Sequence, residues 1–316
     1  MSSISLGFII DPIEMINTKK DSSFAMMLAA QKRGWSLFYM QQGDLYIRDG
    51  VVYARMQSVQ VIDRSQDFYR LGASIEQPLH QLDVALMRKD PPFDMEYIYS
   101  TYLLEMSAKQ GLLVVNRADS IRSANEKLFA TEFPQFCPET LVSRDMQRIK
   151  VFLKELGHIV VKPLDGMGGA MIFQIKQGDT NTNVILEAIT DNGQRTIMAQ
   201  RFLPEYKQGD KRILIVNGEA FPYALARIPA KGEGRANLAA GAEGVGVALT
   251  EREWEICHAL APRLKALGLL FVGLDVIGDY ITEINVTSPT CIRELDRLYG
   301  ADIAGQLMDV IEQALE

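Results

Sequence analysis

The sequence predicts an α/β protein in which a small doubly wound α/β domain precedes antiparallel sheets covered by helices. Two observations support this fold class. Short apolar runs alternate with helical patterns in the first part of the chain, whereas glycine-containing turns join neighbouring strand-like runs in the second part. The length of 316 residues exceeds that of one ordinary domain. We therefore expect two or three domains.

Strands and helices alternate in the first part of the chain. Residues 6–10 form a short apolar run, which is typical of a buried strand. A helix is expected over residues 22–33, because Asp21 offers an N-cap and Gly34 follows its end. Further strands are expected at 37–39, 84–87 and 112–115, with a helix at 95–109. This alternation predicts an α/β domain over residues 1–123.

The second part has a different pattern. Two strand-like runs surround Asn217-Gly218, a pair that favours a tight primed turn, and two more surround residues 278–280. We expect one domain over 124–203 and another over 204–316. The expected helices are 122–131 and 145–156, and the expected strands are 159–162, 171–175, 196–202, 213–216, 221–225, 271–277 and 281–286.

Composition narrows the class of protein. Hydrophobic residues make up 47% and charged residues 23%, as in a globular protein with a sizeable core, and the formal net charge of -7 disfavours a nucleic-acid binder. The first ten residues lack the pattern of a signal peptide, and no apolar run has the length of a membrane span. A cytoplasmic protein is expected. Its three cysteines and three histidines are scattered, which fits neither a disulfide framework nor a zinc site.

Asp275, Glu283 and Asn285 are candidate metal ligands. Glu283 and Asn285 are two apart on an expected strand, so they share a face. A two-residue loop would pair Asp275 with Thr282, whereas a three-residue loop or a bulge would place it opposite Glu283; we predict the latter. Three oxygen donors would suit Mg²⁺. The alternative is a solvated sheet face with chance acidic residues.

A glycine-rich turn follows the strand that ends at Lys162. Gly166, Met167, Gly168 and Gly169 expose backbone N–H groups that can hold phosphate oxygens, although a plain hairpin turn explains the glycines as well. The turn is neither a Walker A loop nor a dinucleotide fingerprint. Nearby residues of less specific pattern include Lys127, which alone reads as surface charge, and Gln200, Phe202 and Leu203, which fit either an adenine pocket or core packing.

Two arginines lie on the strands of the Asn217-Gly218 hairpin. Pairing about that turn places Arg212 opposite residue 223, with Arg227 further along the same rim, where both could clamp a carboxylate or phosphate. They could also be exposed strand ends. Arg293 follows the metal strand. Residues 229–245 are rich in glycine and alanine, and we expect a mobile lid that excludes water, the alternative being a connector without a role.

Taken together, these motifs resemble those of the bacterial glutathione synthetases of the ATP-grasp superfamily, over essentially the whole chain. The stretches that carry the resemblance are 11–12, 19–26, 87–94, 162–169, 210–212, 237–241 and 282–294. After residue 241 the family pattern has a second glycine and a basic residue, whereas this chain has Ala242 and Glu243.

The resemblance implies three domains with ATP between the last two, Mg²⁺ or Mn²⁺ as cofactor, and a homotetramer. It implies roles for the following residues: Lys127, Lys162, Gly166, Met167, Gly168, Gly169, Gln200, Phe202, Leu203 and Asp210 at the nucleotide; Asp275, Glu283 and Asn285 at the metal; Arg212, Arg227, Arg235 and Asn237 in catalysis and loop closure; and Arg88 and Arg293 at the substrates.

The implied reaction joins γ-glutamylcysteine to glycine at the expense of ATP, through an acyl-phosphate. No enzyme nucleophile is required, which agrees with the scattered cysteines and histidines. Two alternatives stay open. Another ATP-grasp ligase would use the same machinery on a different acceptor, and a nucleotide-binding sensor would bind ATP without turnover.

Overall fold

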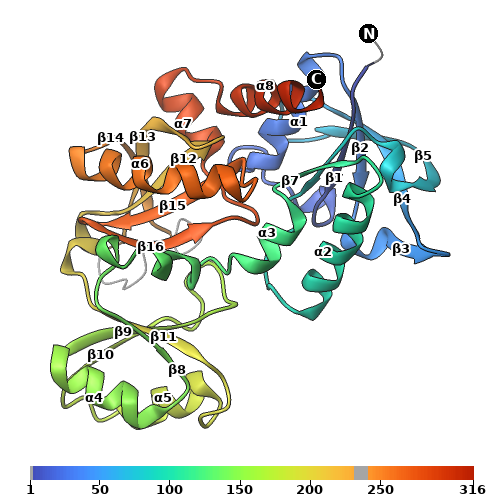
Figure 1. Cartoon of the computed structure of the whole chain (residues 1–316). Helices are drawn as coiled ribbons and strands as arrows, with labels where there is room; N and C mark the ends of the chain where they lie inside the picture. The colour runs from blue at the N-terminus through green and yellow to red at the C-terminus, as the bar shows by residue number, and fades with distance from the viewer. Residues whose placement is uncertain (1–2, 231–240) are drawn as a thin grey trace.

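The computed structural model describes residues 3–230 and 241–316. Within these residues the strands form a seven-stranded, a four-stranded and a five-stranded sheet. Figure 1 shows the four-stranded sheet and its helices as a lobe at the lower end of the molecule, below the five-stranded sheet. The α/β fold class predicted from the sequence is confirmed.

Parallel strands form the centre of the N-terminal sheet. β1 (Ser5–Ile9) pairs with β2 (Ser36–Met40) on one side and with β6 (Val84–Met87) on the other, and β6 pairs with β7 (Leu113–Val115). The helices that connect these strands are α1 (Ser22–Lys32), capped by the Asp21 side chain, and α2 (Met95–Ala108), capped by Asp94. These elements lie within two residues of their predicted bounds.

Three antiparallel strands that the sequence analysis did not predict extend this sheet. They are β3 (Leu45–Arg48), β4 (Val51–Val61) and β5 (Tyr69–Pro78), and β4 pairs with β2, β3 and β5. Along β4, buried residues alternate with partly or fully exposed ones from Val52 to Met56, which is the pattern of a half-buried strand.

The predicted helix over 122–131 is wrong. Helix α3 (Ala118–Ser123) ends at the second residue of that span, and a 3₁₀ turn (Phe129–Glu132) follows. Between them Asn125 organises a turn, because its Oδ1 accepts hydrogen bonds from the backbone N–H groups of Lys127 and Leu128. Its Nδ2 donates to the carbonyl of Leu164. A side chain that bonds to nearby backbone offers the chain an alternative to helix, and here that alternative prevails.

The four-stranded sheet has a small core of its own. Its strands β8 (Thr140–Ser143), β9 (His158–Pro163), β10 (Phe173–Lys176) and β11 (Ile197–Arg201) run in the order β10-β9-β11-β8. Helices α4 (Met146–Leu156) and α5 (Thr182–Thr190) contribute Ile149, Leu153 and Leu186 to the apolar cluster beneath the sheet.

The five-stranded sheet is antiparallel throughout. Its order is β14-β13-β12-β15-β16, with bounds Asp210–Val216 for β12, Glu219–Ile228 for β13, Glu243–Ala248 for β14, Phe271–Ile277 for β15 and Tyr280–Asn285 for β16. Positive φ angles of 48° at Asn217 and 76° at Gly218 confirm the primed turn between β12 and β13.

The predicted loop over 229–245 is too long at its C-terminal end, because β14 begins at Glu243 and pairs with β13. On β14, Gly246 packs closely against the side chain of Tyr299. A Cβ added at Gly246 would lie 2.5 Å from the Tyr299 hydroxyl. Residues 231–240 lie outside the described part of the chain.

Helices on the two faces of this sheet connect it to the rest of the molecule. α6 (Glu251–Ala266) packs on one face. α7 (Ile292–Tyr299) and α8 (Ile303–Leu315) belong to a cluster that also contains Phe24 of α1, so one core joins the N-terminal sheet to the five-stranded sheet. Figure 1 shows α8 beside α1. No helix in the described residues is both apolar enough and long enough to span a membrane.

Candidate active site

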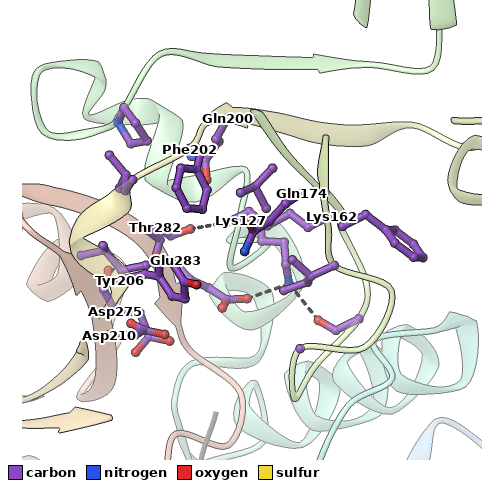
Figure 2. Close-up of a pocket in the computed structure, with 18 of the residues that line it drawn as sticks. Lys127, Lys162, Gln174, Gln200, Phe202, Tyr206, Asp210, Asp275, Thr282 and Glu283 are labelled. Carbon is purple, nitrogen blue, oxygen red and sulfur yellow. Dashed lines mark hydrogen bonds and ion pairs between the residues drawn. The ribbon is translucent and has the colours of Figure 1, made fainter. Parts of the chain in front are cut away.

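A cavity of about 760 Å³ opens between the four-stranded and five-stranded sheets. This volume is in the range of small-molecule sites. Figure 2 shows its lining, with Asp210 and Asp275 below Glu283, Tyr206 beside Glu283, and Phe202 and Gln200 above them. The lining includes Lys127, Lys162, Gly166, Met167, Gly168, Gly169, Gln200, Phe202, Leu203, Asp210, Asp275 and Glu283.

The carboxylates come from paired strands of the five-stranded sheet. Asp275 lies directly opposite Glu283, and the register between the strands shifts immediately after that pair. The connecting loop has only two residues, since Ile277 pairs with Tyr280. The bulge that we offered as an alternative to a longer loop therefore places both carboxylates on one face of the sheet.

Arg212 and Arg227 lie beside these carboxylates. Arg212 donates to both oxygens of Asp275, at 2.5 and 3.0 Å, and the Nη2 atom of Arg227 lies 3.0 Å from Oδ2 of the same residue. Burial opposes ionisation of Asp275, but the two guanidinium groups outweigh it and hold its pKa well below the usual range. The arginines are buried and are not exposed strand ends.

The predicted register of the arginine hairpin was wrong. A bulge between Ile213 and Ile215 places Arg212 opposite Leu225, not opposite residue 223, and Arg227 opposite Asp210. The shift is by two residues, so the arginines keep the same face of the sheet. The bulge brings Arg227 close enough to bind Asp210, with 2.7 Å between Nη2 and Oδ2.

One carboxylate oxygen of Asp210 has no hydrogen-bond partner among residues 3–230 and 241–316. Burial raises the pKa of Asp210 to about 6, although Arg227 opposes the shift. Its Oδ1 atom is buried and makes no hydrogen bond within the described residues. A buried carboxylate oxygen without a partner is costly, and a cation would satisfy it.

Lys127 and Lys162 approach the same face from outside the five-stranded sheet. The Nζ atom of Lys127 lies 2.6 Å from Glu283 Oε1 and donates to the carbonyl of Gly166 at 2.8 Å. Lys162 donates to the carbonyl of Thr282 at 2.9 Å. Both side chains are buried, so neither is ordinary surface charge. Burial lowers the pKa of Lys162 to about 8. Burial also acts to lower the pKa of Lys127, but the charge of Glu283 outweighs this effect and raises that pKa.

The glycine turn after β9 covers this lysine pair. Gly168 and Gly169 have φ angles of 64° and 79°, a region that residues with a Cβ avoid. Phosphate oxygens could lie between this turn and the lysines.

The opposite end of the cavity is flatter and more apolar. Phe202 stacks on His158 with 3.8 Å between ring centroids and meets the ring of Tyr206 edge-on. Leu203 is buried, and Gln200 donates to Thr140 Oγ1 at 3.0 Å. Such a surface suits a planar heterocycle. The sequence analysis missed several lining residues, among them Gln174, Tyr206 and Lys207, because alternation and turn patterns do not show which strand face borders a cavity.

Three other predicted site residues, Arg88, Arg293 and Asn285, are not among the residues that line the cavity. Arg88 is buried and donates to Ser23 Oγ at 3.1 Å and to the carbonyl of Pro289 at 2.8 Å, so it joins the N-terminal sheet to the segment after β16. Arg293 pairs with Asp63 at 2.6 Å. Asn285 donates to the carbonyl of Gly273 at 3.1 Å. The remaining two, Arg235 and Asn237, lie outside the described residues.

Comparison with known proteins gives the family. Residues 4–122 match the model of the N-terminal domain of prokaryotic glutathione synthetase, and residues 126–300 match the model of its ATP-grasp domain. The glutathione synthetase of Pseudomonas aeruginosa is 57% identical over 313 residues, which cover 99% of each chain. This chain belongs to the prokaryotic glutathione synthetase family. The glutathione synthetase of Shewanella oneidensis is 55% identical over 312 residues, again 99% of each chain.

Two solved structures share the fold of this glutathione synthetase family member. D-cycloserine synthetase DcsG has a TM-score of 0.69 at 13% identity and covers 99% of this chain and 100% of its own. The ATP-grasp ligase PsnB, complexed with a minimal precursor, Mg and ADP, has a TM-score of 0.61 at 13% identity and covers 98% of each chain. At such identities the likeness concerns the fold alone.

Proposed function

We propose that this chain is a glutathione synthetase that joins γ-glutamylcysteine to glycine with ATP, through an acyl-phosphate. One observation carries the proposal. Two lysines and two arginines converge on the paired carboxylates Asp275 and Glu283 at the floor of one cavity. Membership of the family supports the choice of substrates.

We propose that ATP lies along the cavity, with adenine at Phe202 and Leu203 and with phosphates at the lysines. The carbonyls of Thr282 and Gly166 accept hydrogen bonds from Lys162 and Lys127. Phosphate oxygens would replace these carbonyls and form stronger, charge-assisted bonds. Backbone N–H groups of Gly166, Met167, Gly168 and Gly169 would cover the phosphates from above.

We propose that a divalent cation binds at the floor in place of some of the bonds that arginines and Lys127 make to the carboxylates. Asp275, Glu283 and Asn285 offer the hard oxygens that Mg²⁺ or Mn²⁺ prefers, and Asp210 adds a buried oxygen without a partner among the described residues. When bound, the ion offsets the charge of the phosphate oxygens.

In the first step a carboxylate oxygen of γ-glutamylcysteine attacks the γ-phosphorus of ATP. A bond forms between the carboxylate oxygen and the γ-phosphorus. The bond between the γ-phosphorus and the oxygen that bridges it to the β-phosphate breaks, and ADP leaves. Arg212 and Arg227 stand where negative charge accumulates, and Lys127 and Lys162 hold the phosphates in line. Arg88, Arg293, Arg235 and Asn237 are proposed to meet the substrates.

In the second step the amine of glycine attacks the acyl carbon. The carbon–nitrogen bond forms, phosphate leaves with the former carboxylate oxygen, and the amine loses a proton. No side chain forms a covalent bond to the substrate. Positioning and electrostatic stabilisation would supply the rate acceleration.

We further propose the organisation of the molecule. Residues 1–123, 124–203 and 204–316 would act as three units, with ATP between the last two. A cytoplasmic homo-oligomer, by resemblance a tetramer, would interact with small molecules and with neither nucleic acid nor membrane.

Phosphate release from ATP and Mg²⁺ tests the proposal, with γ-glutamylcysteine and glycine supplied singly and together. Release that needs both, with glutathione as product, is expected. Release only with another peptide and amine would keep the chemistry and overturn the substrates. Tight ATP binding without release for any pair would favour a nucleotide sensor.

A further inference from the structure

The metal strand β16 is the last strand of its sheet, so one of its edges faces away from β15. Alternate backbone groups along such an edge point outward and need partners. Along this edge the groups are the carbonyl of Thr282 and the N–H groups of Ile284 and Val286. Lys162 bonds to the carbonyl of Thr282, and Glu126, which precedes Lys127, bonds to both N–H groups.

Glu126 supplies most of these partners. Its backbone carbonyl accepts the N–H of Ile284 at 2.8 Å. Its carboxylate Oε1 accepts the N–H of Val286 at 2.9 Å, the N–H of Thr287 at 3.0 Å and the hydroxyl of Thr287 at 2.7 Å. One residue thus takes four hydrogen bonds from the strand and its extension, as a paired strand would.

These bonds fix the position of the next residue in the chain. Lys127 follows Glu126, and its Nζ atom lies 2.6 Å from Glu283, which precedes Ile284 on β16. Asn125 makes the turn on the other side and ties it to the carbonyl of Leu164, close to the glycine turn. The segment is therefore anchored on both sides of the lysine.

Packing alone does not explain a glutamate at this position. Burial and the neighbouring charge of Glu283 raise the pKa of Glu126, so both work against its charged form, whereas the bonds from Thr287 favour that form. A carboxylate placed near another carboxylate is unfavourable unless its hydrogen bonds compensate. The three donors from Val286 and Thr287 that reach its carboxylate supply that compensation.

We propose that Glu126 is a positioning residue that docks the Lys127 segment onto the free edge of β16 and so sets the distance from Lys127 to the nucleotide phosphates. The inference rests on the proposed function in one respect, the role of Lys127 at the phosphates. Glu126 itself would not touch the nucleotide.

Nucleotide binding without peptide substrate tests the inference. In Glu126→Ala the Kd for a non-hydrolysable ATP analogue should rise about tenfold, because hydrogen bonds to a charged group are lost. The Kd for adenosine, which lacks phosphates, should stay unchanged. Glu126→Gln keeps an acceptor oxygen and should recover most of the affinity. Glu132→Gln is the matched control, since Glu132 pairs with Arg263 at the surface.

A double-mutant cycle separates positioning from general stability. Adding Glu126→Ala to Lys127→Met should weaken analogue binding no further, because the group being positioned is already gone. Independent, additive losses would overturn the inference, as would unchanged analogue affinity in Glu126→Ala. If Glu126→Ala fails to fold, Glu126→Gln combined with Thr287→Val decides: a loss for the analogue but not for adenosine supports the inference, and no loss overturns it.

The two proposals can fail separately. A native chain that binds the analogue and shows the predicted dependence on Glu126, yet forms no glutathione, would overturn the proposed reaction alone. Glutathione synthesis with analogue binding that is insensitive to Glu126 would overturn this inference alone.

Discussion

Lys162 should make nucleotide binding depend on pH. Burial lowers the pKa of its ammonium from 10.5 to about 8. The shift corresponds to about 3 kcal/mol, at about 1.4 kcal/mol for each pKa unit. Above pH 8 the side chain becomes neutral and can no longer pair with phosphate charge. We therefore predict that the Kd for a non-hydrolysable ATP analogue rises about tenfold for each pH unit above 8, as the protonated fraction falls.

The free energy of unfolding should increase as pH rises, whereas nucleotide binding weakens. Between pH 8 and pH 10.5 the unfolded chain binds a proton at this lysine that the folded chain has lost. The free energy of unfolding should therefore gain up to about 3 kcal/mol from this group as pH rises through that window, because the unfolded state binds more protons. Partial unfolding would weaken binding and lower stability together. Weaker binding accompanied by higher stability would therefore indicate titration of Lys162.

Isothermal titration calorimetry from pH 7.5 to 9.5 is a suitable assay. The terminal phosphate is already ionised there, since its last pKa is about 6. Burial raises the pKa values of Cys137 and Cys257 to about 11 and about 12, so these thiols do not titrate in the window. Lys162→Arg, which stays charged, should give a flat profile, and Lys127→Arg should keep the slope. A flat native profile, or a slope that survives in Lys162→Arg, would refute the reasoning.

Four further predictions concern Glu283 at the floor of the cavity, two residues that stabilise the fold, and the divalent cation. Glu283→Gln removes the charge beside Lys127 and should lower kcat by about 100-fold or more with the melting temperature retained; normal turnover would contradict its role. Asn116→Ala removes three buried bonds, to the N–H and carbonyl of Phe271 and the carbonyl of Val286, and should cost about 2–4 kcal/mol in urea unfolding; a loss below about 1 kcal/mol would contradict this. Asp145→Ala removes the N-cap of α4 and should cost about 1 kcal/mol without changing kcat, so an equal loss of activity would speak against a purely local cap. Chelation with EDTA should abolish turnover and added Mg²⁺ should restore it, whereas activity that persists would exclude a required divalent ion.

Local patterns were sufficient to predict most elements of the fold. Apolar periodicity and caps located α1, α2 and α4 to within a residue or two, and Asn217-Gly218 identified a hairpin turn. The metal strand was recognised because Glu283 and Asn285 interrupt an apolar strand. These signals depend on neighbours in sequence, which is why they can be interpreted without the structure.

Interactions between distant segments account for some of the failures; helices α5 to α8 were also not predicted, although α6 begins with a local capping box. The turn at Asn125 depends partly on the carbonyl of Leu164, which a helical pattern over 122–131 cannot reveal. The bulge between Ile213 and Ile215 shifted the register of the arginine hairpin, and nothing in local composition marks it. Lys127 read as surface charge until the fold placed it against Glu283. For Asn125 and Lys127 the decisive partner is far away in the chain, whereas the bulge lies within a single hairpin.

Transfer of an oxygen isotope tests the acyl-phosphate most directly. The enzyme would be supplied with ATP, Mg²⁺, glycine and γ-glutamylcysteine that carries ¹⁸O in both oxygens of its reacting carboxylate. If that carboxylate attacks the γ-phosphorus, each inorganic phosphate released should carry one ¹⁸O atom, as measured by mass spectrometry. Phosphate without the label, formed together with glutathione, would contradict the acyl-phosphate mechanism and the roles proposed for the arginines and lysines at the site.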